Sequence, residues 1–471
     1  MNNLWILTEE RPKKEVLSLI IHYFAQDHKF SVKTEKIKIV PQLDDENHFN
    51  FTYQVVGIRC TSVKNIYIKI ISGSSSFVDY LLFFQNDEPN NTNIPLYAIE
   101  VTKTDDEESR NTGIDQRITK FVFVEHYYPR TKKIMLFHSS ISHTIEKRTD
   151  TFIFGFRILR TLNVEILQNS ATPSNNYGPF LSIDELITQK NSMAVRKQNV
   201  SVRIKKTRSK IEISGKLEKK NHLANDPNIG LLTGISCALR KLGWKKDIVI
   251  TQHGLQQTHV GVKNKFVLIA NKYKMFLKGL SVPQAVFPNE YWHYENDGEK
   301  LGTIFIHIVV ENFTNGYSIF ENHAGCEKGY FDAGQKNFLP VKKYTNQKAY
   351  KGGDKKKIYF LPDVVFIDKT QREITTVEGK KSFLFQQGIE DLKNYGPFEK
   401  EYIIPNYKNF SLKRKVVLFG KLEGDIEEIE IAFCLNQNGQ LLLNVDAPSL
   451  FTRGINTLLK YWKNNKKGAR K

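Results

Sequence analysis

Three side chains in the last third of the sequence could act together on a phosphate ester. Asp363 lies at the start of an apolar segment, and Glu378 and Lys380 follow it after a short polar stretch. Two carboxylates supply the hard oxygen ligands that Mg²⁺ prefers, while water and a substrate phosphate fill its remaining positions. A bound Mg²⁺ lowers the pKa of its water and stabilises negative charge in the transition state, and the lysine can orient the nucleophile or neutralise charge. These residue types indicate metal-assisted hydrolysis of a phosphodiester.

A β-hairpin would place these three groups side by side. Asp363 opens the short apolar strand, DKTQRE supplies the turn, and ITTVEGKK returns as the second strand. Because Glu378 and Lys380 are two residues apart on that strand, they project from the same face, whereas Gly379 faces the other way. A helix is expected over residues 382–394, followed by the strand RKVVLFGKL.

Pro362-Asp363 followed by Glu378-Gly379-Lys380 resembles the PD-(D/E)xK signature of Mg²⁺-dependent nucleases, above all the type II restriction endonucleases. The resemblance implies a mixed β-sheet flanked by helices and hydrolysis of DNA to 5′-phosphate and 3′-hydroxyl ends. It also implies that Asp363 and Glu378 bind the metal and that Lys380 acts in catalysis. The motif spans only residues 362–380, and a surface hairpin with an exposed Glu and Lys would give the same letters.

A second, less regular arrangement lies near the N-terminus. Asp79 precedes the strand YLLFFQ, and LYAIEVTKT returns with Glu100 and Lys103. Glu100 and Lys103 are three residues apart, so strict alternation puts them on opposite faces. Either a bulge re-aims Lys103, or Thr102 occupies the lysine position, or Val101 and Lys103 keep the register and the acid has been lost or moved. We expect a second catalytic and metal-binding centre at Asp79, Glu100 and Lys103.

The two regions match element by element. In each, a strand pair is followed by a helix candidate and a further apolar strand, IMLF in the first region and VVLF in the second. Short echoes accompany this order, since Gly113-Ile114-Asp115 in the first helix candidate corresponds to Gly388-Ile389-Glu390 in the second. These echoes are too short to prove a duplication.

Length and composition indicate several folded regions. A chain of 471 residues with 40% hydrophobic and 12% aromatic residues is long enough for two or three domains. We predict a multidomain α/β protein with mixed β-sheets flanked by helices, restriction-endonuclease-like, and in the fullest form of the prediction two such nuclease cores. The stretch QNSATPSNNYGPFLS has the composition of a linker. The predicted regions are an N-terminal nuclease-like domain (1–167), a linker (168–182), a basic central DNA-recognition region (183–300) and a C-terminal nuclease domain (301–471).

The charge of the chain favours double-stranded DNA as the partner. Lys and Arg total 69 against 50 Asp and Glu, which gives a formal charge of +19 and attracts a polyanion. Basic strands between Arg196 and Lys220 could bind phosphates. The helix that begins at Asp226 and the loop behind it offer side chains of the type that read base edges. The residues predicted to bind DNA are Arg203, Lys205, Lys206, Arg208, Lys210, Gln252, His253 and Gln256.

Other classes of protein are disfavoured. The four cysteines are far apart, with no CxxC pair, which argues against a zinc cluster or a disulfide framework. There is no Walker-type glycine loop, so no nucleotide cofactor is expected. Neither a signal peptide nor a long apolar run is present, so we expect no membrane partner and a cytoplasmic location. Richness in Lys, Asn and Ile suggests an A+T-rich bacterium.

We therefore predict an Mg²⁺-dependent type II restriction endonuclease that cuts an asymmetric DNA site with two active centres in one chain. The simpler alternative is a homodimer in which only the centre at Glu378 cuts and the N-terminal region is a DNA-reading scaffold. The chain is thus a monomer or a homodimer. Two other functions are compatible with the same motif and charge: a repair or recombination nuclease acting on structured DNA, and a non-enzymatic basic DNA-binding protein.

Overall fold

The computed structural model describes the chain except for residues 45, 47, 75, 103–108, 139–149, 194–201, 215–225, 323–329, 342–358, 422–429, 444–445 and 469–471. The chain divides into two compact units. Unit 1 comprises Met1–Glu9, Glu15–Ser31 and Ile71–His293, and unit 2 comprises Glu10–Lys14, Val32–Ile70 and Tyr294–Lys471. The predicted boundaries differ from this division. Most of the predicted central region belongs to unit 1, and residues 32–70 belong to unit 2.

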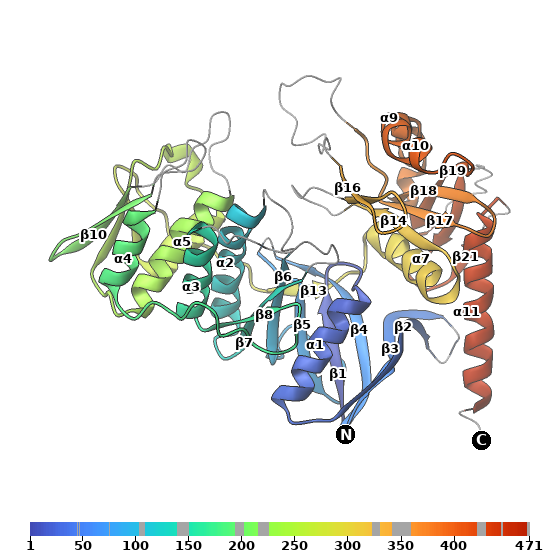
Figure 1. The fold of residues 1–471 in the computed structure, drawn as a ribbon, viewed down its shortest axis with the longest axis horizontal. Helices are drawn as coiled ribbons and strands as arrows, with labels where there is room; N and C mark the ends of the chain where they lie inside the picture. Colours follow the sequence, from blue (N-terminus) through green and yellow to red (C-terminus); the bar gives the residue numbers. More distant parts are fainter. Residues whose placement is uncertain are drawn as a thin grey trace. The chain divides into compact units, whose positions relative to one another are not determined.

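Unit 1 contains a mixed sheet whose strands lie in the order β1, β5, β6, β7, β8 (Figure 1). The pairs β1–β5 and β5–β6 are antiparallel, whereas β6–β7 and β7–β8 are parallel. Each parallel pair is joined through a helix, as a parallel connection requires. These elements are β1 (Asn2–Thr8), α1 (Lys14–Asp27), β5 (Tyr80–Gln85), β6 (Tyr97–Thr102), α2 (Ser109–Tyr127), β7 (Lys132–Phe137), α3 (Asp150–Thr161) and β8 (Val164–Gln168).

A smaller sheet in unit 1 has the strand order β12, β11, β10, β9. The predicted basic strand pair is confirmed, because β9 and β10 pair antiparallel. Helix α5 packs against α2 and α3, and Gly234 permits the close approach: a Cβ atom there would lie 3.1 Å from methyl groups of Ile118 and Ile158. The elements are α4 (Ile183–Ser192), β9 (Arg203–Lys206), β10 (Lys210–Ser214), α5 (Asp226–Lys241), β11 (Asp247–Thr251), α6 (Lys265–Tyr273), β12 (Met275–Leu277) and β13 (Trp292–Tyr294).

Unit 2 contains a second mixed sheet, in the order β14, β17, β18, β19, β20, β21. Its first pairs are again antiparallel, antiparallel, parallel and parallel, so five consecutive strands repeat the arrangement of the sheet in unit 1. Both sheets are mixed and flanked by helices, which confirms the predicted α/β class. The strands are β14 (Tyr317–Glu321), β17 (Val364–Asp368), β18 (Glu373–Lys381), β19 (Ser411–Phe419), β20 (Ile431–Leu435) and β21 (Leu441–Leu443), with β15 (Tyr330–Asp332) and β16 (Phe338–Pro340) forming a separate pair.

Helices cover both faces of the sheet in unit 2. Helices α7 and α8 both contact β18 and β19, and Gly379 and Lys380 on β18 face opposite sides. Thr303 of α7 lies against Gly379 and Gly388 of α8 lies against Lys380, so the two helices cover opposite faces.

Among the helices that the structure describes, none has the length and apolar character needed to span a membrane. The helices of unit 2 are α7 (Lys300–Phe313), α8 (Phe385–Leu392), α9 (Gly396–Phe398), α10 (Ile404–Asn406) and α11 (Ser449–Gly468).

An antiparallel meander explains why residues 32–70 belong to unit 2. Strand β2 (Val32–Leu43) pairs with β3 (Phe49–Cys60), and β3 pairs with β4 (Val63–Gly73). The backbone N–H of Ile39 donates to Asn312 Oδ1 of α7 at 3.0 Å, and the ring centroids of Phe49 and Phe305 are 5.2 Å apart. These contacts link the meander to the elements that flank the second sheet.

Arg11 is the centre of an ion-pair network in unit 2. Its guanidinium binds Glu311 and Glu321, each at 2.8 Å, and its side chain is only 9% exposed. His307 Nε2 lies 3.2 Å from the other oxygen of Glu311. Burial alone would raise the pKa of the Glu311 carboxyl, but the nearby Arg11 guanidinium and His307 lower it to about 2.

We predict that Arg11→Met lowers the free energy of unfolding by about 3 kcal/mol at pH 7, because it leaves two carboxylates without their cation. The folded pKa of Glu311 is below its ordinary value of 4.5, so its stabilisation is present above pH 4.5 and is lost as the pH falls toward 2. The difference between the wild type and Arg11→Met should therefore shrink over that range, as measured by denaturant titration at several pH values. Arg59→Met, at an exposed arginine of the same unit, is the control, and a pH-independent difference would contradict the prediction.

Candidate functional site

The hairpin β17–β18 brings Asp363 and Glu378 together. Val364 pairs with Val377 in antiparallel register, so Asp363, one residue before Val364, lies opposite Glu378, one residue after Val377. The Asp363 backbone N–H donates to the Val377 carbonyl at 2.9 Å, and the Gly379 N–H donates to Asp363 Oδ2 at 2.8 Å. The Asp363 carboxylate is thus fixed by the backbone of the strand that carries Glu378.

The remaining members of this cluster contact Glu378 or Lys380. Lys380 Nζ forms an ion pair with Glu378 Oε1 and lies 3.1 Å from Asp391 Oδ2 of α8. The Tyr395 hydroxyl, beyond α8, donates to Glu378 Oε2. We call Asp363, Glu378, Lys380, Asp391 and Tyr395 the C-terminal cluster. The predicted trio converges, whereas Asp391 and Tyr395 were missed, because their contacts depend on how α8 packs on the sheet.

Burial and like charge govern the ionisation of the C-terminal cluster. Burial raises the pKa of Asp363 well above its ordinary value, and the neighbouring Glu378 raises it further. Burial also raises the pKa of Glu378, although Lys380 and the Tyr395 hydroxyl oppose that shift. For Lys380, burial works against the charge, but Glu378 and Asp391 more than offset it, so its pKa is raised. The cluster therefore holds an ammonium beside carboxyl groups that are costly to ionise together.

Strand β6 builds a closely similar site in unit 1. Tyr80 pairs with Ile99, which is the register of Val364 with Val377 in unit 2. Val101 N–H donates to Asp79 Oδ2 at 2.7 Å, so in both units the first acid accepts a bond from the residue after the glutamate. The Asp79 N–H in turn lies 3.3 Å from Glu100 Oε2.

In the described residues, two cations of this second site come from helix α2. Lys103 lies outside the described residues, and Thr102, two positions after Glu100, is buried. Lys120 of α2 instead places Nζ 2.8 Å from Glu100 and 3.6 Å from Asp79 Oδ1. Arg117 Nε, one helical turn earlier, lies 3.3 Å from Glu100 Oε1. We call Asp79, Glu100, Arg117 and Lys120 the N-terminal cluster.

Burial also dominates the ionisation of Glu100. It raises the pKa of this carboxyl to about 8, with a further contribution from Asp79 and opposition from Lys120 and Arg117. The Lys120 side chain is partly buried, which alone would lower its pKa. Its pKa is nevertheless raised, because the nearby Glu100 and Asp79 carboxylates more than offset the effect of burial. The Glu100 side chain is only 2% exposed and Asp79 is 35% exposed, so Asp79 is the acid that a ligand could approach.

Comparison with known proteins adds no relative to this picture. The chain matches no protein-family model, no curated protein and no solved structure. What the two clusters can do is therefore argued from their own geometry.

The C-terminal cluster fits a metal ion that shares its coordination with water and substrate. No group of three or more His, Cys, Asp or Glu side chains in the described residues is arranged to hold a metal. Mg²⁺, however, is commonly held by one or two carboxylates together with waters and phosphate oxygens. Asp363 and Glu378 supply two such carboxylates, and a divalent cation between them would relieve the repulsion that raises the pKa of Asp363.

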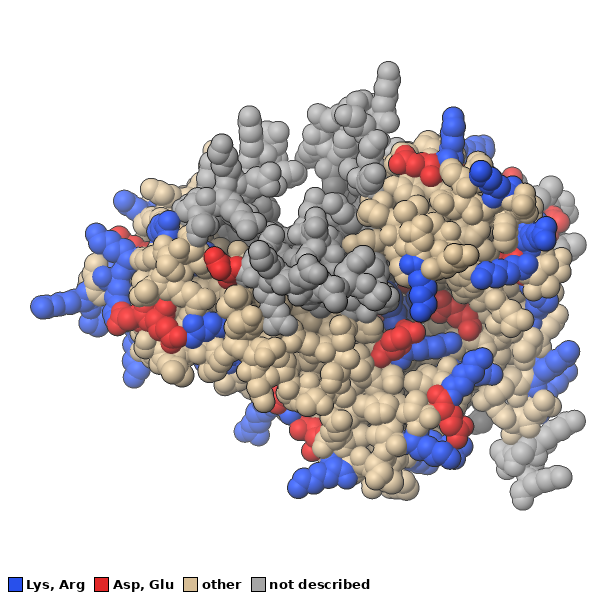
Figure 2. Space-filling view, in the orientation of Figure 1, with Lys and Arg blue, Asp and Glu red and all other residues tan. Residues whose placement is uncertain are grey.

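The predicted phosphate-binding residues lie on an exposed basic strand pair. Figure 2 shows blue Lys and Arg side chains, with acidic ones among them, at the end of unit 1 where Figure 1 labels β10. Several of these cations already have partners in the chain. Lys206 Nζ lies 2.8 Å from Asp184, Lys210 Nζ lies 2.6 Å from Glu212, and Arg203 donates to a backbone carbonyl. Arg203, Lys205, Lys206 and Arg208 are exposed, and Lys210 is partly buried.

The predicted base-reading loop has one structural and two exposed members. His253 is buried, its Nε2 lies 2.9 Å from the Lys278 carbonyl, and its Nδ1 accepts a bond from the Leu255 N–H. Both ring nitrogens are thus engaged within the protein. Gln252 and Gln256 are exposed. Helix α5, which begins at Asp226, packs on α2 and α3, so the face that contacts these helices is not open to a DNA groove.

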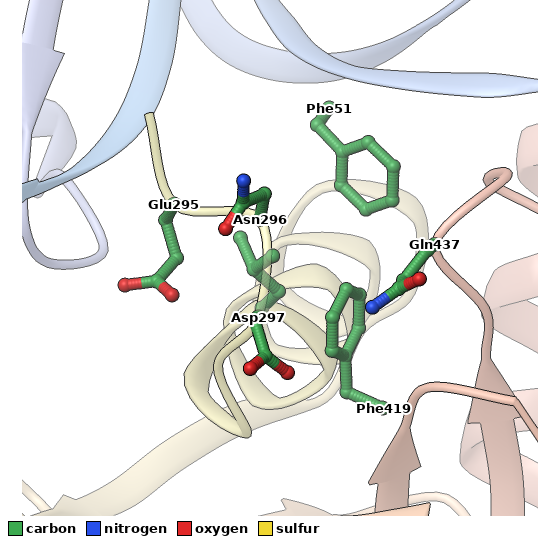
Figure 3. A pocket seen from close by; sticks show the side chains of 7 residues that line it. Phe51, Glu295, Asn296, Asp297, Phe419 and Gln437 are labelled. Atoms are coloured by element: carbon green, nitrogen blue, oxygen red, sulfur yellow. The ribbon is translucent and has the colours of Figure 1, made fainter. Parts of the chain in front are cut away.

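A cavity of about 380 Å³ lies elsewhere in unit 2 (Figure 3). The Phe51 and Phe419 rings stand edge to face in it, with centroids 6.0 Å apart. Asp297 in its wall pairs with Lys381 at 3.0 Å. None of Asp363, Glu378 and Lys380 lines the cavity, so it is distinct from the C-terminal cluster. Its lining residues are Phe51, Glu295, Asn296, Asp297, Leu301, Phe419 and Gln437.

We predict that Gly379→Ala lowers the free energy of unfolding by about 2 kcal/mol, because a Cβ atom at this position would lie 2.2 Å from Thr303 Oγ1. Gly396→Ala is the matched control. Nothing lies within 4 Å of a Cβ atom there, and alanine is favoured in a helix. Denaturant titration of both variants measures the effect. Equal stabilities would mean that α7 does not approach β18 as closely as this geometry requires.

Proposed function

We propose that the protein is an Mg²⁺-dependent DNA endonuclease of the type II restriction class. The observation that carries this proposal is the convergence of Asp363 and Glu378 from adjacent strands, with the Lys380 ammonium on Glu378. This constellation corresponds residue by residue to the PD-(D/E)xK motif. The strand and helix order around it supports a restriction-endonuclease-like core, and the repeated order in unit 1 supports a second core.

Asp363 and Glu378 are the residues that hold the metal in this proposal. When bound there, Mg²⁺ supplies a water of lowered pKa and positive charge beside the phosphate. The hydrogen bond from Gly379 N–H holds Asp363 in place, and the Tyr395 hydroxyl orients Glu378. Lys380, kept protonated by Glu378 and Asp391, offers its ammonium to a phosphate oxygen or to the attacking water.

The charge of the chain supports DNA as the substrate. A formal charge of +19 favours a polyanion, and β9 and β10 present exposed cations that can contact phosphates. In the full form of the proposal, Asp79 and Glu100 make a second active centre, so that one chain cuts both strands of an asymmetric site in the bacterial cytoplasm. A gene for a DNA methyltransferase beside the gene for this chain would support this function, because the host must protect its own DNA.

We predict that Glu378→Gln and Lys380→Met each reduce double-strand cleavage by a factor of about 10² to 10³, since each removes charge from the site where the transition state develops. Lys381→Met is the matched control. Lys381 is the next residue on the strand, faces away from the cluster and pairs with Asp297. Cleavage is measured as linear plasmid formed at saturating Mg²⁺, with melting temperatures recorded to show that the variants fold. Full activity in both cluster variants would refute the proposal.

The same assay separates the alternative functions. Discrete fragments from a plasmid indicate a restriction enzyme, and nicks that depend on branched or looped substrates indicate a repair or recombination nuclease. Intact DNA of shifted mobility indicates a binding protein without nuclease activity.

We predict that Asp363→Ala converts the protein into a nicking enzyme that cuts one defined strand, because the Asp79 and Glu100 centre remains. Strand-specific sequencing of the nicks checks this result. Complete loss of cleavage would instead favour the homodimer, in which two copies of the Glu378 centre make the two cuts and unit 1 reads or holds DNA.

A further inference from the structure

The helices behind the two clusters differ at corresponding positions. Lys120 follows Gly113 of the Gly-Ile-Asp echo by seven residues, and Tyr395 follows Gly388 of the Gly-Ile-Glu echo by seven residues. Both side chains contact the second acid of their cluster, Glu100 or Glu378. The echo is therefore matched by contacts in space, and it defines which other positions correspond.

By the same alignment, Arg117 of α2 corresponds to Leu392, and Gln116 corresponds to Asp391 of α8. On the strands, Thr102 corresponds to Lys380, two residues after the glutamate in each unit. The two clusters therefore differ by more than the position of one lysine, on a strand in unit 2 and on a helix in unit 1. At the corresponding positions, unit 1 has Arg117 in place of Leu392 and Gln116 in place of Asp391, the carboxylate that binds the lysine in unit 2.

These differences change the formal charge of the clusters. The N-terminal cluster balances two carboxylates, Asp79 and Glu100, with two cations, so its formal charge is zero. The C-terminal cluster sets three carboxylates against the single Lys380 ammonium, which leaves two negative charges. Glu299 adds further negative potential at Asp363. The two clusters therefore share a backbone geometry, but their formal charges differ by two.

We propose that the two clusters bind divalent cations with unequal affinity, tightly at Asp363 and Glu378 and weakly at Asp79 and Glu100, because Arg117 and Lys120 already compensate the acids of unit 1. The inference rests on the proposed function, in which both clusters hold Mg²⁺. A nearby charge changes the affinity of a carboxylate for a proton by about tenfold or more. Two such charges predict a difference in metal affinity on the order of a hundredfold.

Unequal affinity makes the Mg²⁺ concentration decide the product. At low Mg²⁺ only the C-terminal cluster is loaded and one strand is nicked. At high Mg²⁺ both clusters are loaded and both strands are cut. The nicked plasmid should therefore accumulate at low Mg²⁺ even at complete substrate conversion.

The test is direct metal binding to the full chain without DNA, with Mn²⁺ as the probe and free Mn²⁺ measured by electron paramagnetic resonance. We expect one tight and one weak site per chain, with the tight site lost in Glu378→Gln and the weak site lost in Glu100→Gln. Arg117→Gln should tighten the weak site by about tenfold, because it removes one positive charge beside Glu100. Arg117→Lys, which keeps the charge, should leave its affinity near that of the wild type.

A variant in unit 2 tests the same idea with the opposite sign. Asp391→Asn should weaken the tight site by about tenfold. Glu390→Gln is the matched control, because this exposed residue is the neighbouring acid on the same helix. Two sites of equal affinity, or affinities that do not respond to Arg117→Gln and Asp391→Asn, would overturn the inference. The absence of any metal-dependent cleavage by the wild type would instead overturn the proposed function on which it rests.

Discussion

The constraint on which the rest of the structure depends is the antiparallel register that sets one carboxylate beside another at the end of a strand pair. Val364 opposite Val377 leaves Asp363 no place other than beside Glu378, and the Gly379 N–H fixes it there. Taking two like charges out of water costs several kcal/mol unless cations or hydrogen bonds compensate them. The bonds from the Gly379 N–H, Lys380 and Tyr395 provide part of this compensation. Buried acids whose pKa values remain raised in this way are typical of functional sites.

Local patterns predicted the parts of the site that local geometry determines. Alternation along one strand placed Glu378 and Lys380 on one face, and a polar turn predicted the hairpin that carries Asp363. Lys120 could not be found in this way, because it reaches Glu100 from a helix twenty residues further along the chain and only the packing of α2 on the sheet brings it there. The Gly-Ile-Asp echo was the one available signal, and it became informative only when Tyr395 was seen to make the corresponding contact.

The same limit applies to contacts elsewhere in the chain. His253 has the residue type of a base reader, but a sequence does not reveal that both of its ring nitrogens are engaged by the loop itself. Residues 32–70 form strands β2 and β3 and most of β4. Composition does not say which helix those strands will pack against, and the bond from Ile39 to Asn312 joins segments far apart in the sequence.

In both clusters the backbone determines the position of the first acid, whereas side chains determine the charge around it. Backbone pairing reproduces the bond from Val101 or Gly379 to the first acid with nearly the same length in both units, 2.7 and 2.8 Å. The compensating charges come from the helices, where a substitution alters the electrostatics without disturbing that register. The repeated strand arrangement can therefore keep its geometry while, among the described residues, one copy has two cations, Arg117 and Lys120, beside its acids and the other has Lys380 alone. If both copies hold Mg²⁺, as proposed above, the charge around each acid pair should decide how strongly each copy attracts it.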